Sequence, residues 1–160
     1  HEPDDTVLKD GDCVLIDVGC KREGYCSDMT RTFFFRKVRD PKHKEIYEIV
    51  RKAVETAESM LKPGVPLCDV DAAARKVIED AGYGPNFTHR LGHFIGLEDH
   101  EYGDVSLANH NVAQVGNVFS IEPGIYIEGE VGVRIEDLVM ITEDGCEILN
   151  SYPKELSIIE

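Results

Sequence analysis

The stretch from Phe119 to Glu136 consists of two largely apolar runs separated by Glu128-Gly129-Glu130, a pattern that predicts two β-strands joined by a turn. The strands are rich in Ile, Val, Phe and Tyr, and the turn centres on Gly129. Glu122 and Glu136 each lie seven residues from Gly129, so antiparallel pairing places the two carboxylates opposite each other on one face. Two like charges in that position require a cation between them or a retained proton.

A second hairpin with the same feature is predicted near the N-terminus. Its strands cover 13–19 and 25–33, and a polar turn at 21–24 joins them. Each apolar strand carries one carboxylate, Asp17 in the first and Asp28 in the second. The midpoint of these positions falls between Arg22 and Glu23, inside the turn, so the pattern predicts that Asp17 and Asp28 pair side by side.

Two amphipathic helices separate the hairpins. Apolar residues recur every three or four positions from Pro41 to about Leu61, and Pro63-Gly64 ends that pattern. A second helix is predicted from Asp69 to about Ala81, with Asp69 as its cap. A final strand pair covers 137–142 and 146–149. Strands and helices in this order predict an α+β fold with an antiparallel sheet covered by helices.

Composition limits the setting of the protein. The chain has 160 residues, is 42% hydrophobic and suits one globular domain. Its net charge of −14 disfavours nucleic acid and anionic membranes as partners. We expect no membrane span and no secretory leader. Five cysteines without a CxxC pair argue against a disulfide framework and favour a cytoplasmic, reducing location.

Three histidines, His89, His93 and His100, fall within twelve residues between glycines. With the four strand carboxylates they form an oxygen-rich ligand set, which suits a pair of divalent cations better than a tetrahedral structural zinc. Two such ions can share a bridging water, lower its pKa and stabilise an oxyanion, which is the chemistry of hydrolysis. The competing interpretation is a buried hydrogen-bonded network, in which Arg31 and Arg134 pair with two of the carboxylates.

Five segments, in order along the chain, resemble the signatures of the metallopeptidases of family M24, which have the pita-bread fold. They are Leu15-Ile16-Asp17-Val18-Gly19, Gly24-Tyr25 with Ser27-Asp28-Met29-Thr30-Arg31-Thr32, His89-x-x-Gly92-His93-x-Ile95-Gly96, Ser120-Ile121-Glu122-Pro123-Gly124-Ile125-Tyr126 and Val133-Arg134-Ile135-Glu136-Asp137. The resemblance runs from Asp12 to about Ile159. The last two segments are similar to the proline-specific branch, the Xaa-Pro aminopeptidases and Xaa-Pro dipeptidases (prolidases).

The resemblance implies five metal ligands, Asp17, Asp28, His93, Glu122 and Glu136. Asp28 and Glu136 would bridge two ions, Asp17 would complete one site, and His93 with Glu122 would complete the other. The implied cofactor is a pair of divalent metal ions, with Mn²⁺ favoured over Co²⁺, Zn²⁺ and Fe²⁺.

The resemblance also implies roles around the metals. Glu122 would shuttle the proton of the bridging water. His89 and His100 would orient the substrate and stabilise the tetrahedral intermediate. Arg134 would hold Asp17 in place for the metal.

The function implied is hydrolysis of the Xaa-Pro bond by a metal-bridging hydroxide, in a dipeptide or at a peptide N-terminus. The substrate would carry proline at its second position, and a homodimer is compatible with the resemblance. Residues 1–160 would form most of the catalytic domain, with its start and any preceding domain absent. Two alternatives stay open: a non-catalytic peptide-binding module of the same fold, and a methionine aminopeptidase-like activity. A metal-free creatinase-like hydrolase is disfavoured because all five ligands are present.

Overall fold

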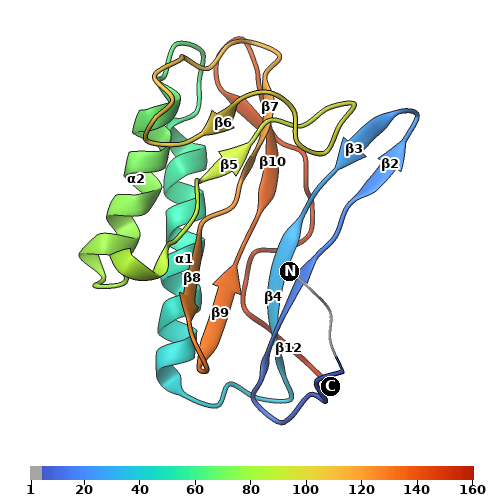
Figure 1. The fold of residues 1–160 in the computed structure, drawn as a ribbon, viewed down its shortest axis with the longest axis vertical. Coiled ribbons are helices and arrows are strands. Elements are labelled where there is room, and N and C mark those ends of the chain that lie inside the picture. Colours follow the sequence, from blue (N-terminus) through green and yellow to red (C-terminus); the bar gives the residue numbers. More distant parts are fainter. Residues whose placement is uncertain (1–4) are drawn as a thin grey trace.

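The computed structural model describes residues 5–160, which form an α+β fold with two helices on one side of a set of strands (Figure 1). In chain order, the elements are β1 (Cys13–Asp17), β2 (Cys20–Arg22), β3 (Tyr25–Ser27), β4 (Thr30–Phe35), α1 (Pro41–Met60), α2 (Leu67–Asp80), a 3₁₀ turn (Gly84–Asn86), β5 (Gly92–His93), β6 (Asp104–Val105), β7 (Val118–Ile121), β8 (Gly124–Ile127), β9 (Val131–Arg134), β10 (Asp137–Ile141), β11 (Cys146–Ile148) and β12 (Ser157–Ile159). The predicted α+β class is confirmed.

Helix α1 has the predicted extent and buries the predicted face. The Asp40 side chain accepts a hydrogen bond from the backbone N–H of Lys42 at 2.9 Å, and Pro41 occupies the first turn, where its missing N–H costs nothing. The fully buried members of the apolar face are Ile46, Val50, Ala53, Val54 and Ala57. They pack against α2 and against the strands of the second hairpin.

Helix α2 begins at Leu67, so the predicted cap at Asp69 is wrong. Asp69 lies inside the first turn instead. The N–H groups of Leu67 and Cys68 donate to the backbone carbonyls of Asn111 and Asn109, each at 2.9 Å. Because the neighbouring loop satisfies these donors, the helix begins without a side-chain cap.

The second hairpin has the predicted register about Gly129. Gly124 pairs with Arg134 on β8 and β9, and Ile121 pairs with Asp137 on β7 and β10. Both pairs are symmetric about residue 129, although a short break separates the inner strands from the outer ones. Glu122 and Glu136 lie at equivalent positions in that break, so the prediction that they oppose each other is confirmed.

The first hairpin differs from its predicted register by two residues. Asp17 pairs with Thr30 rather than with Asp28. The reason is the turn, which is formed by Glu23 and Gly24, both with positive φ (52° and 93°), as a two-residue hairpin turn requires. A shift of two residues preserves the face, so the Asp17 and Asp28 carboxylates remain diagonal neighbours.

A parallel strand pair extends the sheet of the first hairpin at one edge. Strand β12 runs parallel to β4, with Ile158 beside Phe34, and the sheet order is β1-β4-β12. The β2–β3 hairpin extends away from the body of the molecule (Figure 1). Strand β3 is linked to the loop after β5, because the N–H of Cys26 donates to the carbonyl of Gly96 at 2.7 Å.

A network of buried charges includes Asp137, on strand β10 of the second hairpin. Asp137 accepts from Arg31 at 2.6 Å and from Lys154 at 2.8 Å, and Lys154 also donates to both oxygens of Glu58. Arg31 therefore pairs with Asp137, and the alternative in which it neutralises one of the four strand carboxylates is wrong. Burial raises the pKa of Glu58 to about 7, against the opposing effect of Lys154.

Replacing Lys154 by Met should destabilise the chain most at high pH. Removal of the ammonium group leaves Glu58 and Asp137 without one of their counter-ions, and we expect a loss of about 2 kcal/mol at pH 8 because Lys154 is partly solvated. A carboxyl group with a raised pKa in the folded state favours folding at low pH and loses that contribution as pH rises. The loss at pH 5 should therefore be smaller.

Thermal or urea unfolding of the variant at pH 5 and pH 8 measures this effect. Lys52→Met, on the exposed side of α1, is the matched control and should change stability little at either pH. An equal loss for Lys154→Met at both pH values would contradict the explanation.

Candidate metal centre and its pocket

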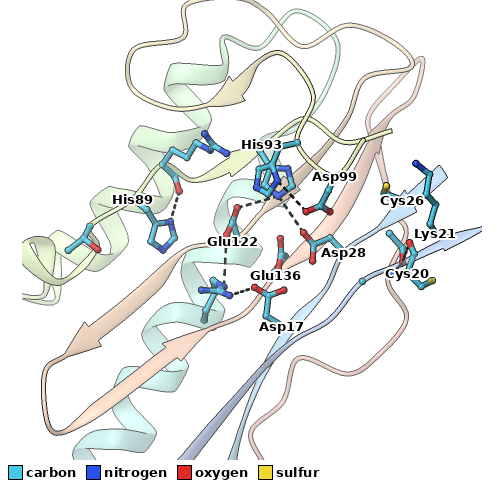
Figure 2. A pocket seen from close by; sticks show the side chains of 16 residues that line it. Asp17, Cys20, Lys21, Cys26, Asp28, His89, His93, Asp99, Glu122 and Glu136 are labelled. Carbon is cyan, nitrogen blue, oxygen red and sulfur yellow. Dashed lines mark hydrogen bonds and ion pairs between the residues drawn. The ribbon is translucent and has the colours of Figure 1, made fainter. Parts of the chain in front are cut away.

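All eight site residues predicted from the sequence line one pocket. It has a volume of about 1020 Å³ and opens where the two hairpins and the β5 region meet (Figure 2). The eight predicted site residues that line it are Asp17, Asp28, His89, His93, His100, Glu122, Arg134 and Glu136. They come from segments more than a hundred residues apart, so the fold brings them together.

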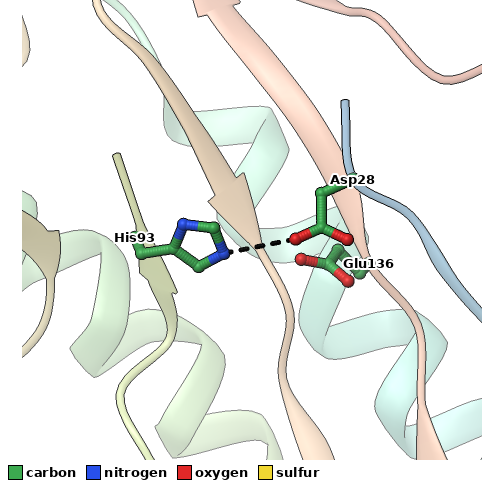
Figure 3. Close-up of side chains that lie close together, drawn as sticks. All are labelled: Asp28, His93 and Glu136. Atoms are coloured by element: carbon green, nitrogen blue, oxygen red, sulfur yellow. Dashed lines mark ion pairs between the residues drawn. The ribbon is translucent and has the colours of Figure 1, made fainter. Parts of the chain in front are cut away.

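Three of the five predicted ligands form a compact donor cluster. Asp28, His93 and Glu136 each offer one atom, and these atoms all lie within 4.8 Å of one another (Figure 3). Asp28 lies between β3 and β4, His93 on β5, and Glu136 between β9 and β10. The Nε2 atom of His93 is 3.4 Å from a carboxylate oxygen of Asp28.

The backbone around His93 fixes the direction of its ring. A Cβ atom at Gly92 would lie 1.8 Å from the carbonyl oxygen of Ser120, so only glycine allows β5 to pack this closely on β7. The N–H of His93 donates to Ser120 Oγ at 2.9 Å, and Nδ1 lies 3.2 Å from the carbonyl of Phe94. Nδ1 therefore donates to that carbonyl, and Nε2 faces Asp28, where it could bind a metal ion. Burial lowers the pKa of His93, but its partners, Asp28 first among them, together outweigh that effect and raise the pKa.

Burial disfavours the charged form of the acidic side chains in the pocket. Burial, together with the charges of Glu122 and Asp28, raises the pKa of Glu136 to about 8. Burial also raises the pKa of Glu122, although His93 and Arg134 oppose that shift. Glu136 is 1% exposed and keeps one neutral donor, the Thr30 hydroxyl at 2.6 Å. Its raised pKa is the signature of a carboxylate that needs a cation.

Glu122 and Asp17 line the same pocket outside the three-residue cluster. An oxygen of Glu122 lies 3.7 Å from Nε2 of His93 and accepts a hydrogen bond from Ser120 at 3.2 Å. Asp17 is ion-paired with Arg134, and its side chain is 35% exposed. Burial raises the pKa of Asp17 while Arg134 lowers it.

Arg134 connects the two hairpins at the base of the pocket. Besides Asp17, its guanidinium donates to the hydroxyl of Thr30 at 3.1 Å and to that of Tyr126 at 3.2 Å, and it lies 3.9 Å from Glu122. Its side chain is buried. This is the contact expected of a residue that holds Asp17 in position.

The two other predicted histidines have different environments. His89 accepts from the hydroxyl of Tyr126 at Nε2 (2.9 Å) and donates from Nδ1 to the carbonyl of Arg90 (2.7 Å). Burial lowers the pKa of His89, which keeps the ring neutral. His100 is exposed, stacks on His93 with ring centroids 4.0 Å apart, and lies 3.2 Å from Asp99.

Three hydroxyl groups that support the site were not assigned a role from the sequence. Thr30 contacts Glu136, Ser120 contacts His93 and Glu122, and Tyr126 contacts His89 and Arg134. Strand periodicity could have indicated two of them, since Thr30 and Ser120 each stand two residues from a ligand carboxylate on the same face. Tyr126 carried no such signal, because its partners come from separate segments.

The donor set fits a divalent metal. Four carboxylates and one imidazole are typical of the first-row ions with mixed oxygen and nitrogen ligands. Burial, followed by the charges of Glu122 and Asp28, raises the pKa of Glu136, and a cation bound beside it would oppose both effects. The pocket therefore has the chemistry of a metal centre, and Asp28, His93 and Glu136 form its candidate core.

Comparison with known proteins agrees with the geometry. The model of metallopeptidase family M24 matches residues 1–143. An uncharacterized peptidase of Staphylococcus saprophyticus is 52% identical over 95% of this chain, which covers 43% of that protein.

Two solved structures are similar over nearly the whole chain. A prolidase from Thermococcus sibiricus is 42% identical over 99% of this chain and 43% of its own, with a TM-score of 0.96. An X-Pro aminopeptidase from Thermotoga maritima is 41% identical over 98% of this chain and 44% of its own, with a TM-score of 0.94. The chain thus spans less than half the length of these relatives and shares their pita-bread fold, and it belongs to metallopeptidase family M24.

Proposed function

We propose that this chain forms most of the catalytic domain of a peptidase that hydrolyses the bond between a residue and a following proline. The observation that carries the proposal is the convergence of Asp28, His93 and Glu136 in one pocket, with Glu122 beside them. The structures similar to this chain include a prolidase and an X-Pro aminopeptidase, which favours proline at the second position of the substrate.

In this proposal, Asp17, Asp28, His93, Glu122 and Glu136 hold two divalent metal ions, with Mn²⁺ as the favoured metal. Four carboxylates balance the charge of two such ions, which removes the repulsion within the pocket. When bound, the ions would supply Lewis acidity and activate water near neutral pH.

The protein's own side chains then move protons and position the substrate. Glu122 takes a proton from the attacking water and delivers it to the leaving nitrogen, a role that its raised pKa favours. His100 is open to the pocket and donates a hydrogen bond to the developing oxyanion. His89 in its neutral form accepts from Tyr126, so we assign it to substrate positioning.

Two alternative functions are less well supported. A non-catalytic peptide-binding module has no use for a donor cluster that includes a buried glutamate with a raised pKa. A methionine aminopeptidase-like activity is disfavoured by the proline-directed activities that the similar structures carry in their names. Cleavage of a dipeptide and cleavage from a longer peptide both stay within the proposal.

The cellular setting is also part of the proposal. All five cysteines are unpaired, as a reducing cytoplasm would keep them. In residues 5–160, no helix combines the length and apolar character that a membrane crossing needs. A homodimer stays a prediction from the sequence.

Cleavage of Xaa-Pro substrates tests the reaction class. Chain stripped with chelator and reloaded with Mn²⁺ should release proline from an Xaa-Pro dipeptide or the first residue from Xaa-Pro-Yaa, and Glu122→Gln should lower kcat by about 100-fold or more because the proton carrier is lost. Glu128→Gln, on an exposed turn, is the matched control and should retain wild-type turnover. Full turnover by the Glu122 variant would overturn its role.

Metal affinity tests the ligand assignment without relying on turnover. His93→Ala removes the nitrogen donor of the cluster, and titration calorimetry with Mn²⁺ should show affinity weakened by at least about tenfold. His110→Ala changes an exposed histidine outside the pocket and should bind Mn²⁺ as the wild type does. Unchanged affinity in the His93 variant would exclude it as a ligand.

A further inference from the structure

Arginine side chains in this acidic chain are almost all neutralised by carboxylates. The chain has 31 acidic and 17 basic side chains, and eight of the basic ones are arginines. Seven have a carboxylate partner: Arg22 with Glu23, Arg31 with Asp137, Arg36 with Asp10, Arg39 with Asp12, Arg51 with Glu48, Arg75 with Asp71 and Arg134 with Asp17. Within residues 5–160, Arg90 is the exception.

The exception lies in the candidate active site. Arg90 lines the pocket and follows His89 directly. The peptide that follows Arg90 is held because its carbonyl accepts from His89 at 2.7 Å and its N–H, that of Leu91, donates to Asp71 at 3.0 Å. The preceding peptide is held because the carbonyl of His89 accepts from Arg75 at 3.0 Å. The guanidinium is exposed and makes no hydrogen bond or ion pair with any of residues 5–160. A fixed backbone thus places in the lining of the pocket a guanidinium that has no partner among the described residues.

With two divalent ions bound, the net charge of the pocket would favour an anionic group on the ligand. Asp17, Asp28, Asp99, Glu122 and Glu136 oppose Lys21, Arg90 and Arg134. With neutral histidines, five negative and three positive side chains give a net charge of −2. Two divalent ions would change this to +2. Arg134 is buried against Asp17, and Lys21 donates to the carbonyl of Leu97 at 2.7 Å, so Arg90 has the most available donors.

We propose that Arg90 is a specificity-determining residue that binds a carboxylate of the substrate. The inference rests on the proposed function and adds the substrate class to it. A guanidinium offers two parallel N–H donors that match the geometry of a carboxylate. The carboxylate has two sources in an Xaa-Pro substrate: the C-terminus of a dipeptide, or the side chain of an acidic Xaa residue.

Three substrates that differ only in their carboxylates separate these sources. Ala-Pro carries a C-terminal carboxylate, Glu-Pro-amide carries a side-chain carboxylate, and Ala-Pro-amide carries neither. Arg90→Gln in the Mn²⁺-loaded chain should lower kcat/KM for a carboxylate substrate by about 10- to 100-fold, mainly through KM, and leave Ala-Pro-amide unchanged. Loss on Ala-Pro identifies the C-terminus, and loss on Glu-Pro-amide identifies the side chain.

Two further variants separate charge from geometry. Arg90→Lys keeps the charge without the paired donors and should recover only part of the loss. Arg22→Gln removes the same charge from the exposed end of β2, outside the pocket, and should change nothing. Equal losses on all three substrates, or no loss on any, would overturn the proposal.

A binding measurement keeps this test separate from the proposed activity. The probe is an Ala-Pro analogue with a reduced, uncleavable bond, in free-acid and amide forms, together with the Glu-Pro-amide equivalent. The wild-type chain should bind a carboxylate form about tenfold more tightly than the Ala-Pro-amide form, and Arg90→Gln should abolish the difference. If the wild type cleaves no substrate but shows this difference, the proposed function fails and the role of Arg90 stands. Absence of the difference in the wild type, or its survival in Arg90→Gln, would exclude the role.

Discussion

Repulsion among the four carboxylates that the two hairpins bring into one pocket is the constraint on which the rest of the structure depends. Asp17 has Arg134 as its partner, whereas Glu136 is buried with only a hydroxyl donor and has a pKa of about 8. Groups of this kind are stable as anions only when a cation is present. The protein concentrates negative charge that its own side chains do not balance, which is the property expected of a binding site for divalent metal.

The scaffold makes this concentration of charge possible by pairing strands in fixed registers. Symmetry of the second hairpin about Gly129 sets Glu122 across from Glu136, and the first hairpin brings Asp28 within reach through a turn at Glu23 and Gly24. Close packing of Gly92 on β7 then aims His93 at the same point. The buried network of Arg31, Lys154, Glu58 and Asp137 holds β10 immediately beyond Glu136.

Sequence alone was sufficient where a local rule determined the geometry. The α+β class, the extent of α1 and the opposition of Glu122 and Glu136 follow from periodicity and from distance to a turn. The register of the first hairpin was wrong by two residues because the two-residue turn at Glu23 and Gly24 was not recognised. Other predictions failed where a distant segment decided the outcome. The start of α2 depends on carbonyls of the 109–111 loop, and the partner of Arg31 is Asp137. The absence of a partner for Arg90 within residues 5–160 likewise depends on its three-dimensional neighbours, which no spacing along the chain reveals.

Anomalous X-ray scattering from crystals grown with Mn²⁺ tests the central claim most directly, because it counts and locates the ions without relying on activity. The account predicts two manganese positions in the pocket, with Asp28 and Glu136 contacting both and His93 contacting one. Manganese absent from the pocket, or a single ion that contacts neither Asp28 nor Glu136, would contradict it.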